Sequence, residues 1–178
     1  MRDDPVPLLP PPPVPSLALD SSRWSELTQA YGTAEDIPQL LIALEQRDSR
    51  AHRELFLGLW ATLCPGDTVT SAAFAATPHL LQWSVRRPSA ERALALHLMT
   101  EIELRRAAVG APAVPADLAA AHDAAVRAMT ARAAPVNGDT WSADVAQVMA
   151  AALVMGHGHG PLARAILALG ESGEGAEG

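Results

Sequence analysis

Apolar residues recur along the middle of this chain at the spacing of an α-helix. One such segment places Ile37, Leu40, Leu41 and Leu44 at positions i, i+3, i+4 and i+7. This spacing gathers apolar side chains on one helix face, wide enough to pack against a neighbouring helix. Four later segments repeat the pattern, over residues 55–63, 94–102, 118–129 and 145–152. No stretch alternates apolar and polar residues for long enough to predict a strand.

Turn-forming residues separate these segments. Glycine and proline interrupt helices, and Asp and Ser favour helix starts. The interruptions stand at Gly32, Asp48, residues 65–66, 88–89, 110–115, 135–139 and 156–161. The pattern therefore predicts an all-α fold of seven or eight helices.

A repeat of about 40 residues is visible within the helical region. Residues 38–41 read Pro-Gln-Leu-Leu, and residues 78–81 read Pro-His-Leu-Leu. A second helical segment follows each copy, over residues 51–63 and 91–104. Helix pairs of this length with a proline early in the first helix are typical of HEAT and armadillo repeats, which stack into solenoids. We therefore predict a short right-handed α-solenoid; the alternative is a chance similarity between Ala- and Leu-rich helices.

The repeat makes a specific structural prediction. The two proline-containing helices should pack side by side and roughly parallel, because they occupy equivalent places in successive repeats. Leu41 and Leu81 should both be buried. Truncating either leucine to Ala should then cost on the order of 2–5 kcal/mol.

The first half of this region resembles a known family. The residues that carry the resemblance are Trp24, the Ala-Tyr-Gly at 30–32 and the Asp-Ile-Pro-Gln-Leu-Leu at 36–41. They resemble the opening of a group of bacterial HEAT-repeat-like proteins that is abundant in actinobacteria, and Trp60 is similar to the Leu-Trp of that group. The resemblance covers about residues 22–84. Residues 65–70 read Pro-Gly-Asp-Thr-Val-Thr, where the group usually has His-Gln-Gly-Thr-Val-Tyr.

The resemblance implies a helical-repeat fold without an established enzymatic activity. Members of the group are suspected of interaction roles, including the neutralisation of a toxin. The departure at residues 65–70 puts any shared role of that loop in doubt here.

Composition and charge restrict the possible functions. The chain has 36 Ala and 23 Leu in 178 residues, which favours helices. It has no Lys, and 20 acidic residues against 13 Arg give a net charge of −7. Nucleic acid is therefore an unfavourable partner, because phosphates require clustered positive charge. No apolar run approaches the ~20 residues that span a bilayer. The single cysteine, Cys64, allows no internal disulfide and fits a reducing cytoplasm.

The two ends differ in composition from the middle. Residues 1–20 are rich in proline and residues 171–178 in Gly and Glu, so we predict disordered tails around a helical domain over residues 21–170. Deleting both tails should leave the stability unchanged.

Candidate catalytic and metal-binding residues are few. His157 and His159 flank a glycine and would supply two metal ligands, but a closed zinc site takes four, and a glycine hinge explains the pattern more simply. Cys64 ends a helix, where the helix dipole disfavours a thiolate. Glu101 and Glu103 point to different helix faces. No serine elbow or phosphate loop is present, so we expect neither catalysis nor a metal or cofactor.

The leading hypothesis is a non-catalytic protein-binding module, such as an immunity or regulatory protein that acts on one polar or basic partner. The five candidate partner-binding residues are Glu54, Trp83, Arg86, Arg87 and Glu101. Trp and Arg are enriched at binding hot spots, and the remaining large aromatic residues, Tyr31 among them, are expected to lie mostly in the core. Reversing the charges of Glu54 and Glu101 together should weaken binding and slow association at low salt.

The alternative hypothesis is a small-molecule-binding protein, or an enzyme of an unrecorded kind, that uses a cavity between helices. Met99, Met149 and Met155 are candidates to line such a cavity, because methionine adapts to irregular surfaces.

Overall fold

The computed structural model describes residues 15–135 and 139–171. In chain order the elements of this part are η1 (Ser22–Glu26), β1 (Thr28–Gln29), β2 (Gly32–Thr33), α1 (Ile37–Gln46), α2 (Ser49–Leu63), α3 (Ser71–Ser84), α4 (Ser89–Arg106), α5 (Ala116–Ala133), α6 (Ala143–Gly156) and α7 (Gly160–Glu171). The predominantly helical fold is therefore confirmed. The antiparallel pair β1–β2 was not predicted, because two-residue strands are too short to show a period of two.

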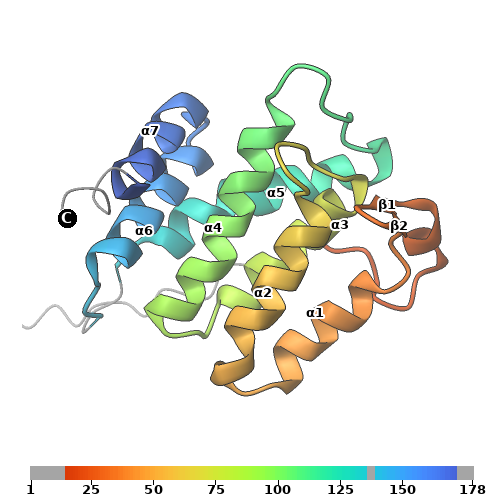
Figure 1. Ribbon diagram of the computed structural model, residues 1–178, viewed down its shortest axis with the longest axis horizontal. Helices are drawn as coiled ribbons and strands as arrows, with labels where there is room; N and C mark the ends of the chain where they lie inside the picture. The colour runs from red at the N-terminus through yellow and green to blue at the C-terminus, as the bar shows by residue number, and fades with distance from the viewer. Residues whose placement is uncertain (1–14, 136–138, 172–178) are drawn as a thin grey trace, which may run out of the picture.

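The helices lie in two rows. One row consists of α1, α3 and α5, and the other of α2, α4 and α6. Helices that are neighbours within a row are in contact, and the sequential pairs α1–α2, α3–α4 and α5–α6 also pack together. The last helix, α7, packs on α6 and α4. Figure 1 shows α2, α4 and α6 in front and α3 and α5 behind them.

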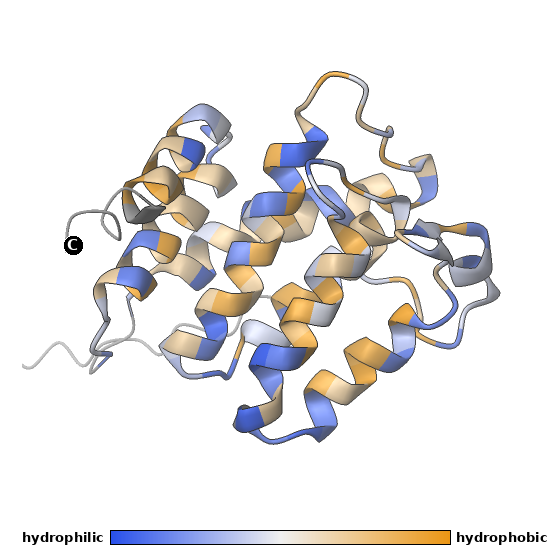
Figure 2. Ribbon diagram, in the orientation of Figure 1, coloured by the Kyte–Doolittle hydropathy of each residue, from blue (hydrophilic) through white to orange (hydrophobic). Residues whose placement is uncertain are grey.

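The central helix α3 explains the alanine content. Its residues from Ala72 to Pro78 are all buried, and its neighbours are α1, α2, α4, α5 and β1. A helix that is covered on every side is apolar all round, and alanines allow its neighbours to approach closely. Figure 2 shows the contrast with the turn between α1 and α2, where hydrophilic residues gather.

The predicted pairing of the two proline-containing helices is found. Helices α1 and α3 are in contact, and Leu41 and Leu81 are 5% and 3% exposed. The indole Nε1–H of Trp83, near the end of α3, donates to the carbonyl oxygen of Leu44, near the end of α1, at 2.9 Å. Since the carboxyl ends of two packed helices lie together, the helices run in the same direction.

The proline position differs from the prediction. Pro38 is the second residue of α1, but α3 begins at Ser71, so Pro78 is its eighth residue rather than an early one. Burial of the surrounding side chains keeps α3 helical although Pro78 lacks an amide hydrogen.

Residues 15–20 are part of the packed structure, which moves the predicted domain boundary at residue 21. Leu17 and Leu19 pack against the core. Trp24 Nε1–H donates to the Ala18 carbonyl at 3.0 Å, and His79 Nε2–H donates to the Leu17 carbonyl at 2.8 Å. The other parts of the predicted tails, residues 1–14 and 172–178, lie outside the described residues.

Candidate functional site

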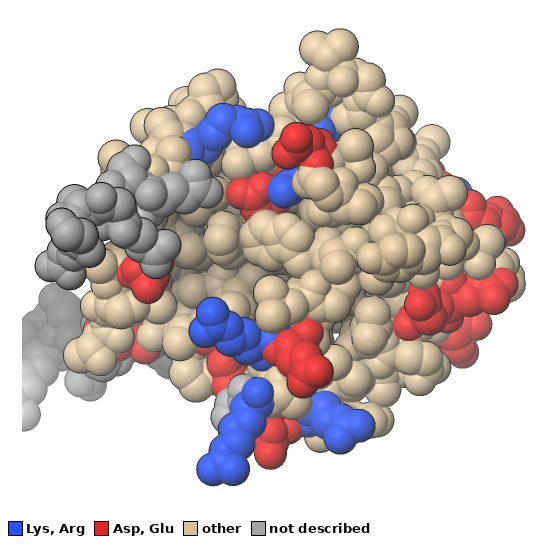
Figure 3. All heavy atoms as spheres, in the orientation of Figure 1, with Lys and Arg blue, Asp and Glu red and all other residues tan. Residues whose placement is uncertain are grey.

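A groove crosses the face formed by α2, α4, α6 and α7. It consists of two hollows of about 810 Å³ and about 470 Å³ that share Trp60 and His97. We call the larger one the apolar hollow and the smaller one the charged hollow. In Figure 3 the middle of this face is recessed and mostly uncharged.

The apolar hollow lies between α2 and α6 over α4. Its apolar lining residues are Phe56, Leu57, Trp60, Ala90, Ala93, Leu94, Val145 and Val148. Leu57 leaves 64% of its surface exposed and adds apolar surface at the edge of this hollow. The polar groups that line the same hollow include Arg53, Glu91 and Asp144, so its charges are of both signs.

Trp60 and His97 form the junction between the two hollows. Their rings meet edge to face, with centroids 4.9 Å apart. Burial lowers the pKa of His97 below its ordinary value of 6.5, and Arg105 lowers it further while Glu101 opposes this. The imidazole is therefore neutral at neutral pH, and the junction is an uncharged aromatic surface.

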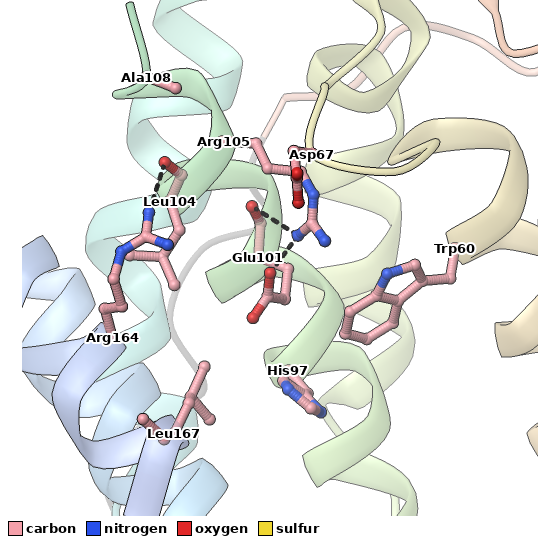
Figure 4. Close-up of a pocket in the computed structure, with 10 residues that line it drawn as sticks. Trp60, Asp67, His97, Glu101, Leu104, Arg105, Ala108, Arg164 and Leu167 are labelled. Carbon is pink, nitrogen blue, oxygen red and sulfur yellow. Dashed lines mark hydrogen bonds and ion pairs between the residues drawn. The ribbon is translucent and has the colours of Figure 1, made fainter. Parts of the chain in front are cut away.

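The charged hollow has acidic and basic groups on its walls (Figure 4). Arg105 pairs with the Glu101 carboxylate and donates to the Gly66 carbonyl at 3.1 Å, and its guanidinium lies 5.9 Å from the centre of the Trp60 ring. Arg164 reaches in from α7 and donates to the Leu104 carbonyl at 3.4 Å. Asp67, in the loop after α2, completes the set of charges.

Of the five predicted partner-binding residues, only Glu101 lines this groove. Glu54 is exposed on α2 but borders a separate hollow of about 360 Å³, together with Arg47 and Leu55. Arg86 is exposed beyond the end of α3. The structure therefore does not gather the five predicted residues at one site, although Trp83 and Arg87 are in contact.

Trp83 is a core residue, which corrects the prediction of a partner-binding role. It is 4% exposed, and its ring packs against Phe56 and His52 at centroid distances of 5.1 and 5.0 Å. Arg87 covers it, with the guanidinium carbon 4.7 Å from the ring centre, and pairs with Glu45 at 3.2 Å. The prediction failed because burial depends on the neighbouring elements, and α1, α2, α4, α5 and β1 cover most of α3.

Tyr31 was expected to lie in the core, but the structure places it at the surface. It lies in the turn between β1 and β2 and is 80% exposed. The amide of the neighbouring Ala30 donates to the Thr62 carbonyl at 3.0 Å, which holds the turn against the end of α2.

A buried ionic cluster lies on the other side of α4. The Glu103 carboxylate accepts from His122 Nε2 at 2.7 Å and from the Arg106 guanidinium at 2.7 Å, and Phe74 packs against the His122 ring. Burial raises the pKa of Glu103, but the hydrogen bonds from His122 and Arg106 outweigh it and hold the pKa below its ordinary value of 4.5. Glu101 and Glu103 thus face opposite ways, as the sequence predicted.

The described residues contain no group of three His, Cys, Asp or Glu side chains that would hold a metal ion. His157 and His159 are exposed in the loop between α6 and α7. Cys64 is buried, and burial raises the pKa of its thiol to about 12, so it is unsuited to act as a nucleophile.

The methionines do not form a shared cavity. Met99 and Met149 are 0% and 1% exposed in the core, whereas Met155 borders another hollow, of about 340 Å³, beside Arg106. The prediction of a methionine-lined cavity is therefore wrong for two of its three residues.

Sequence reasoning missed Trp60, His97 and Leu57 as groove residues. A signal was present on α2, where Leu55, Phe56, Leu57 and Trp60 spread apolar surface over roughly 200° of the helix circumference, wider than the face that packs on one neighbouring helix. The far wall could not be inferred, because it comes from α6 and α7, more than 80 residues further along the chain.

Comparison with protein-family models, curated proteins and solved structures finds no match for this chain. Among the helices of the described ranges, none is both long enough and apolar enough to cross a membrane.

Proposed function

We propose that this chain is a non-catalytic protein-binding module whose groove receives a segment of a partner protein. The observation that carries the proposal is the union of two hollows at Trp60 and His97 into one extended depression. Extended grooves of this kind suit a polypeptide segment, which docks apolar side chains and leaves polar ones at the rim. An immunity or regulatory protein that acts on one partner would fit this arrangement.

The two helix rows support a finer description of the fold. We propose a short right-handed α-solenoid of HEAT-like helix pairs, formed by α1–α2, α3–α4 and α5–α6, in keeping with the family resemblance over residues 22–84. Contacts between helices two apart in the chain are what stacked pairs require. In this description the second helix of each pair, α2, α4 and α6, lines the groove, and solenoids commonly bind ligands along such an aligned face.

The charges of the groove suggest a polar partner rather than a polyanion. Arg53, Arg105 and Arg164 are balanced by Glu91, Asp144, Asp67 and Glu101. Charged groups across an interface are arranged so that opposite signs meet. We therefore expect a partner segment with an apolar centre and with charges of both signs.

A substitution inside the apolar hollow tests this proposal. The wild-type chain, used as bait in a lysate of its source organism, should capture a partner, and the affinity of the purified pair should then be measured by calorimetry. Leu57→Arg should weaken binding about tenfold or more, because it places a charge in an apolar contact. Leu57 is exposed, so the fold should persist.

Leu169→Arg is the matched control, since Leu169 is 72% exposed on α7 and does not line either hollow. Equal affinities for the two variants would place the interface elsewhere. A wild-type chain that captures no partner would contradict the protein-binding function itself.

A charge-reversal experiment tests the electrostatic part. Glu54→Arg combined with Glu101→Arg should slow association with the partner at low salt, because charges in the groove and on the surface near it act on the encounter of the two proteins. The salt dependence of the association rate, followed by stopped flow, is the readout. An unchanged rate would exclude this acidic pair from the interface.

A second candidate function is the binding of a small molecule in the charged hollow. Its volume of about 470 Å³ lies within the range of small-ligand sites, and its walls combine apolar surface with a few charged groups.

A further inference from the structure

The charged hollow contains opposite charges that do not neutralise each other. Arg164 extends from α7 on one wall, and Glu101 extends from α4 (Figure 4). The two side chains form no ion pair, and among the described residues Arg164 pairs with no carboxylate. Its guanidinium group donates one long hydrogen bond, of 3.4 Å, to the backbone carbonyl of Leu104. Positive charge at this wall is therefore available to a ligand.

The negative charge of the hollow is also available. Arg105 occupies one oxygen of the Glu101 carboxylate, and Figure 4 shows the carboxyl group near the middle of the hollow. A carboxylate accepts about four hydrogen bonds, so its capacity is not exhausted by one guanidinium. Arg105 is in turn held by the Gly66 carbonyl at 3.1 Å, which fixes the pair in place.

Asp67, in the loop after α2, adds a second carboxylate to the lining (Figure 4). Trp60, His97, Leu104 and Leu167 supply uncharged surface around the charged groups. Burial lowers the pKa of His97, so the imidazole adds no positive charge at neutral pH. A ligand that enters the hollow therefore meets the carboxylates of Glu101 and Asp67, the guanidinium group of Arg164 and an apolar surface together.

We propose that the charged hollow binds a small zwitterion, an α-amino acid with an apolar side chain. Its ammonium group is received by Glu101, its carboxylate by Arg164, and its side chain by Trp60 and Leu167. This ligand class matches both signs of charge and the apolar surface of the hollow, whereas an anion meets Glu101 and Asp67, and a cation meets Arg164, as like charges. The inference rests on the second candidate function and is independent of a protein partner.

Three related probes separate the contributions of the charges. L-phenylalanine carries both charges, 3-phenylpropionate only the carboxylate, and phenethylamine only the ammonium group. In titrations of the full chain at neutral pH, followed by Trp fluorescence and calorimetry, L-phenylalanine should bind at least about tenfold more tightly than either analogue, since each charged contact adds to the affinity.

Two variants assign the contacts. Glu101→Gln should weaken L-phenylalanine and phenethylamine but not 3-phenylpropionate, and Arg164→Gln should weaken L-phenylalanine and 3-phenylpropionate but not phenethylamine. Glu54→Gln and Arg127→Gln are matched controls, because both residues are exposed and lie outside the charged hollow. Unchanged circular dichroism melts confirm that each variant is folded.

Absence of saturable L-phenylalanine binding in the folded wild-type chain would overturn the proposal. Equal affinity for the three probes, or equal effects of the site and control variants, would overturn it as well. None of these outcomes affects the protein-binding proposal, which is tested with Leu57→Arg and a protein partner.

Discussion

At the scale of single residues, the buried carboxylate of Glu103 is the centre of a polar cluster in the core. It is 5% exposed and accepts hydrogen bonds from both His122 and Arg106. A buried charge is tolerated when hydrogen bonds replace the lost water. If one partner is removed, the remaining buried groups lack a hydrogen-bond partner, and the folded state is destabilised.

Glu103→Gln should therefore lower the free energy of unfolding by roughly 3 kcal/mol at neutral pH. The folded-state pKa of Glu103 lies below 4.5, so its contribution is present above pH 4.5 and is lost as the pH falls through the lower value. Urea unfolding between acidic and neutral pH should show a smaller pH dependence in the variant than in the wild type.

The control is Glu45→Gln, which removes an ion pair with Arg87 in which the Glu45 side chain is 61% exposed. An exposed pair contributes about 1 kcal/mol or less. If the two variants lose the same free energy of unfolding, the buried Glu103 cluster contributes no more to stability than an exposed ion pair.

At the scale of elements, helix packing is set by small residues at the crossings. A Cβ atom added at Gly156, the last residue of α6, would lie 2.7 Å from Thr130 Cγ2 and 3.1 Å from the Val126 carbonyl oxygen of α5. At Gly58, within α2, a Cβ atom meets nothing within 4 Å. The same residue type therefore has a packing role in one helix and none in the other.

Two alanine substitutions should change stability in opposite directions. Gly58→Ala should raise the free energy of unfolding by about 1 kcal/mol, because Ala favours the helix. Gly156→Ala should lower it by roughly 1–3 kcal/mol, because α5 and α6 must separate. Thermal melts of the two variants measure this, and a gain in stability at Gly156 would contradict the close α5–α6 packing.

At the scale of the whole molecule, the structure joins the beginning of the described chain to its central helix. Leu17 and Leu19 pack on the core, and the Leu17 carbonyl accepts from His79 of α3. The proline-rich composition of residues 1–20 suggested a disordered tail throughout. The apolar side chains of Leu17 and Leu19 pack on the core instead, and the backbone beside them bonds to η1 and α3.

Deletion of residues 1–20 should therefore lower the free energy of unfolding by about 2 kcal/mol or more, because it exposes apolar surface and removes the hydrogen bonds to the Leu17 and Ala18 carbonyls. Deletion of residues 1–14 keeps every one of these contacts and is the matched comparison; we expect it to be neutral. Urea unfolding of both variants measures the difference in the free energy of unfolding. Equal values would mean that residues 15–20 do not contribute to stability.

The amino-acid sequence by itself determined that the fold is helical, where most helices lie and that α1 and α3 both contain a Pro-x-Leu-Leu segment. Periodicity, turn residues and helix propensity are local properties, so they can be read without knowledge of the neighbours. The sequence also indicated the absence of a recognisable catalytic motif. It did not place Trp83 or Tyr31 correctly, because burial depends on which other elements cover a residue.

Only the tertiary structure decided where the groove lies. Trp60 on α2, His97 on α4 and Arg164 on α7 come from three helices that are separated by tens of residues, and their proximity depends on the order in which the helices stack. Helix spacing tells which side chains share one face, but not which faces meet. The pairing of faces results from the packing of the whole molecule, where each helix is covered by neighbours from distant parts of the chain.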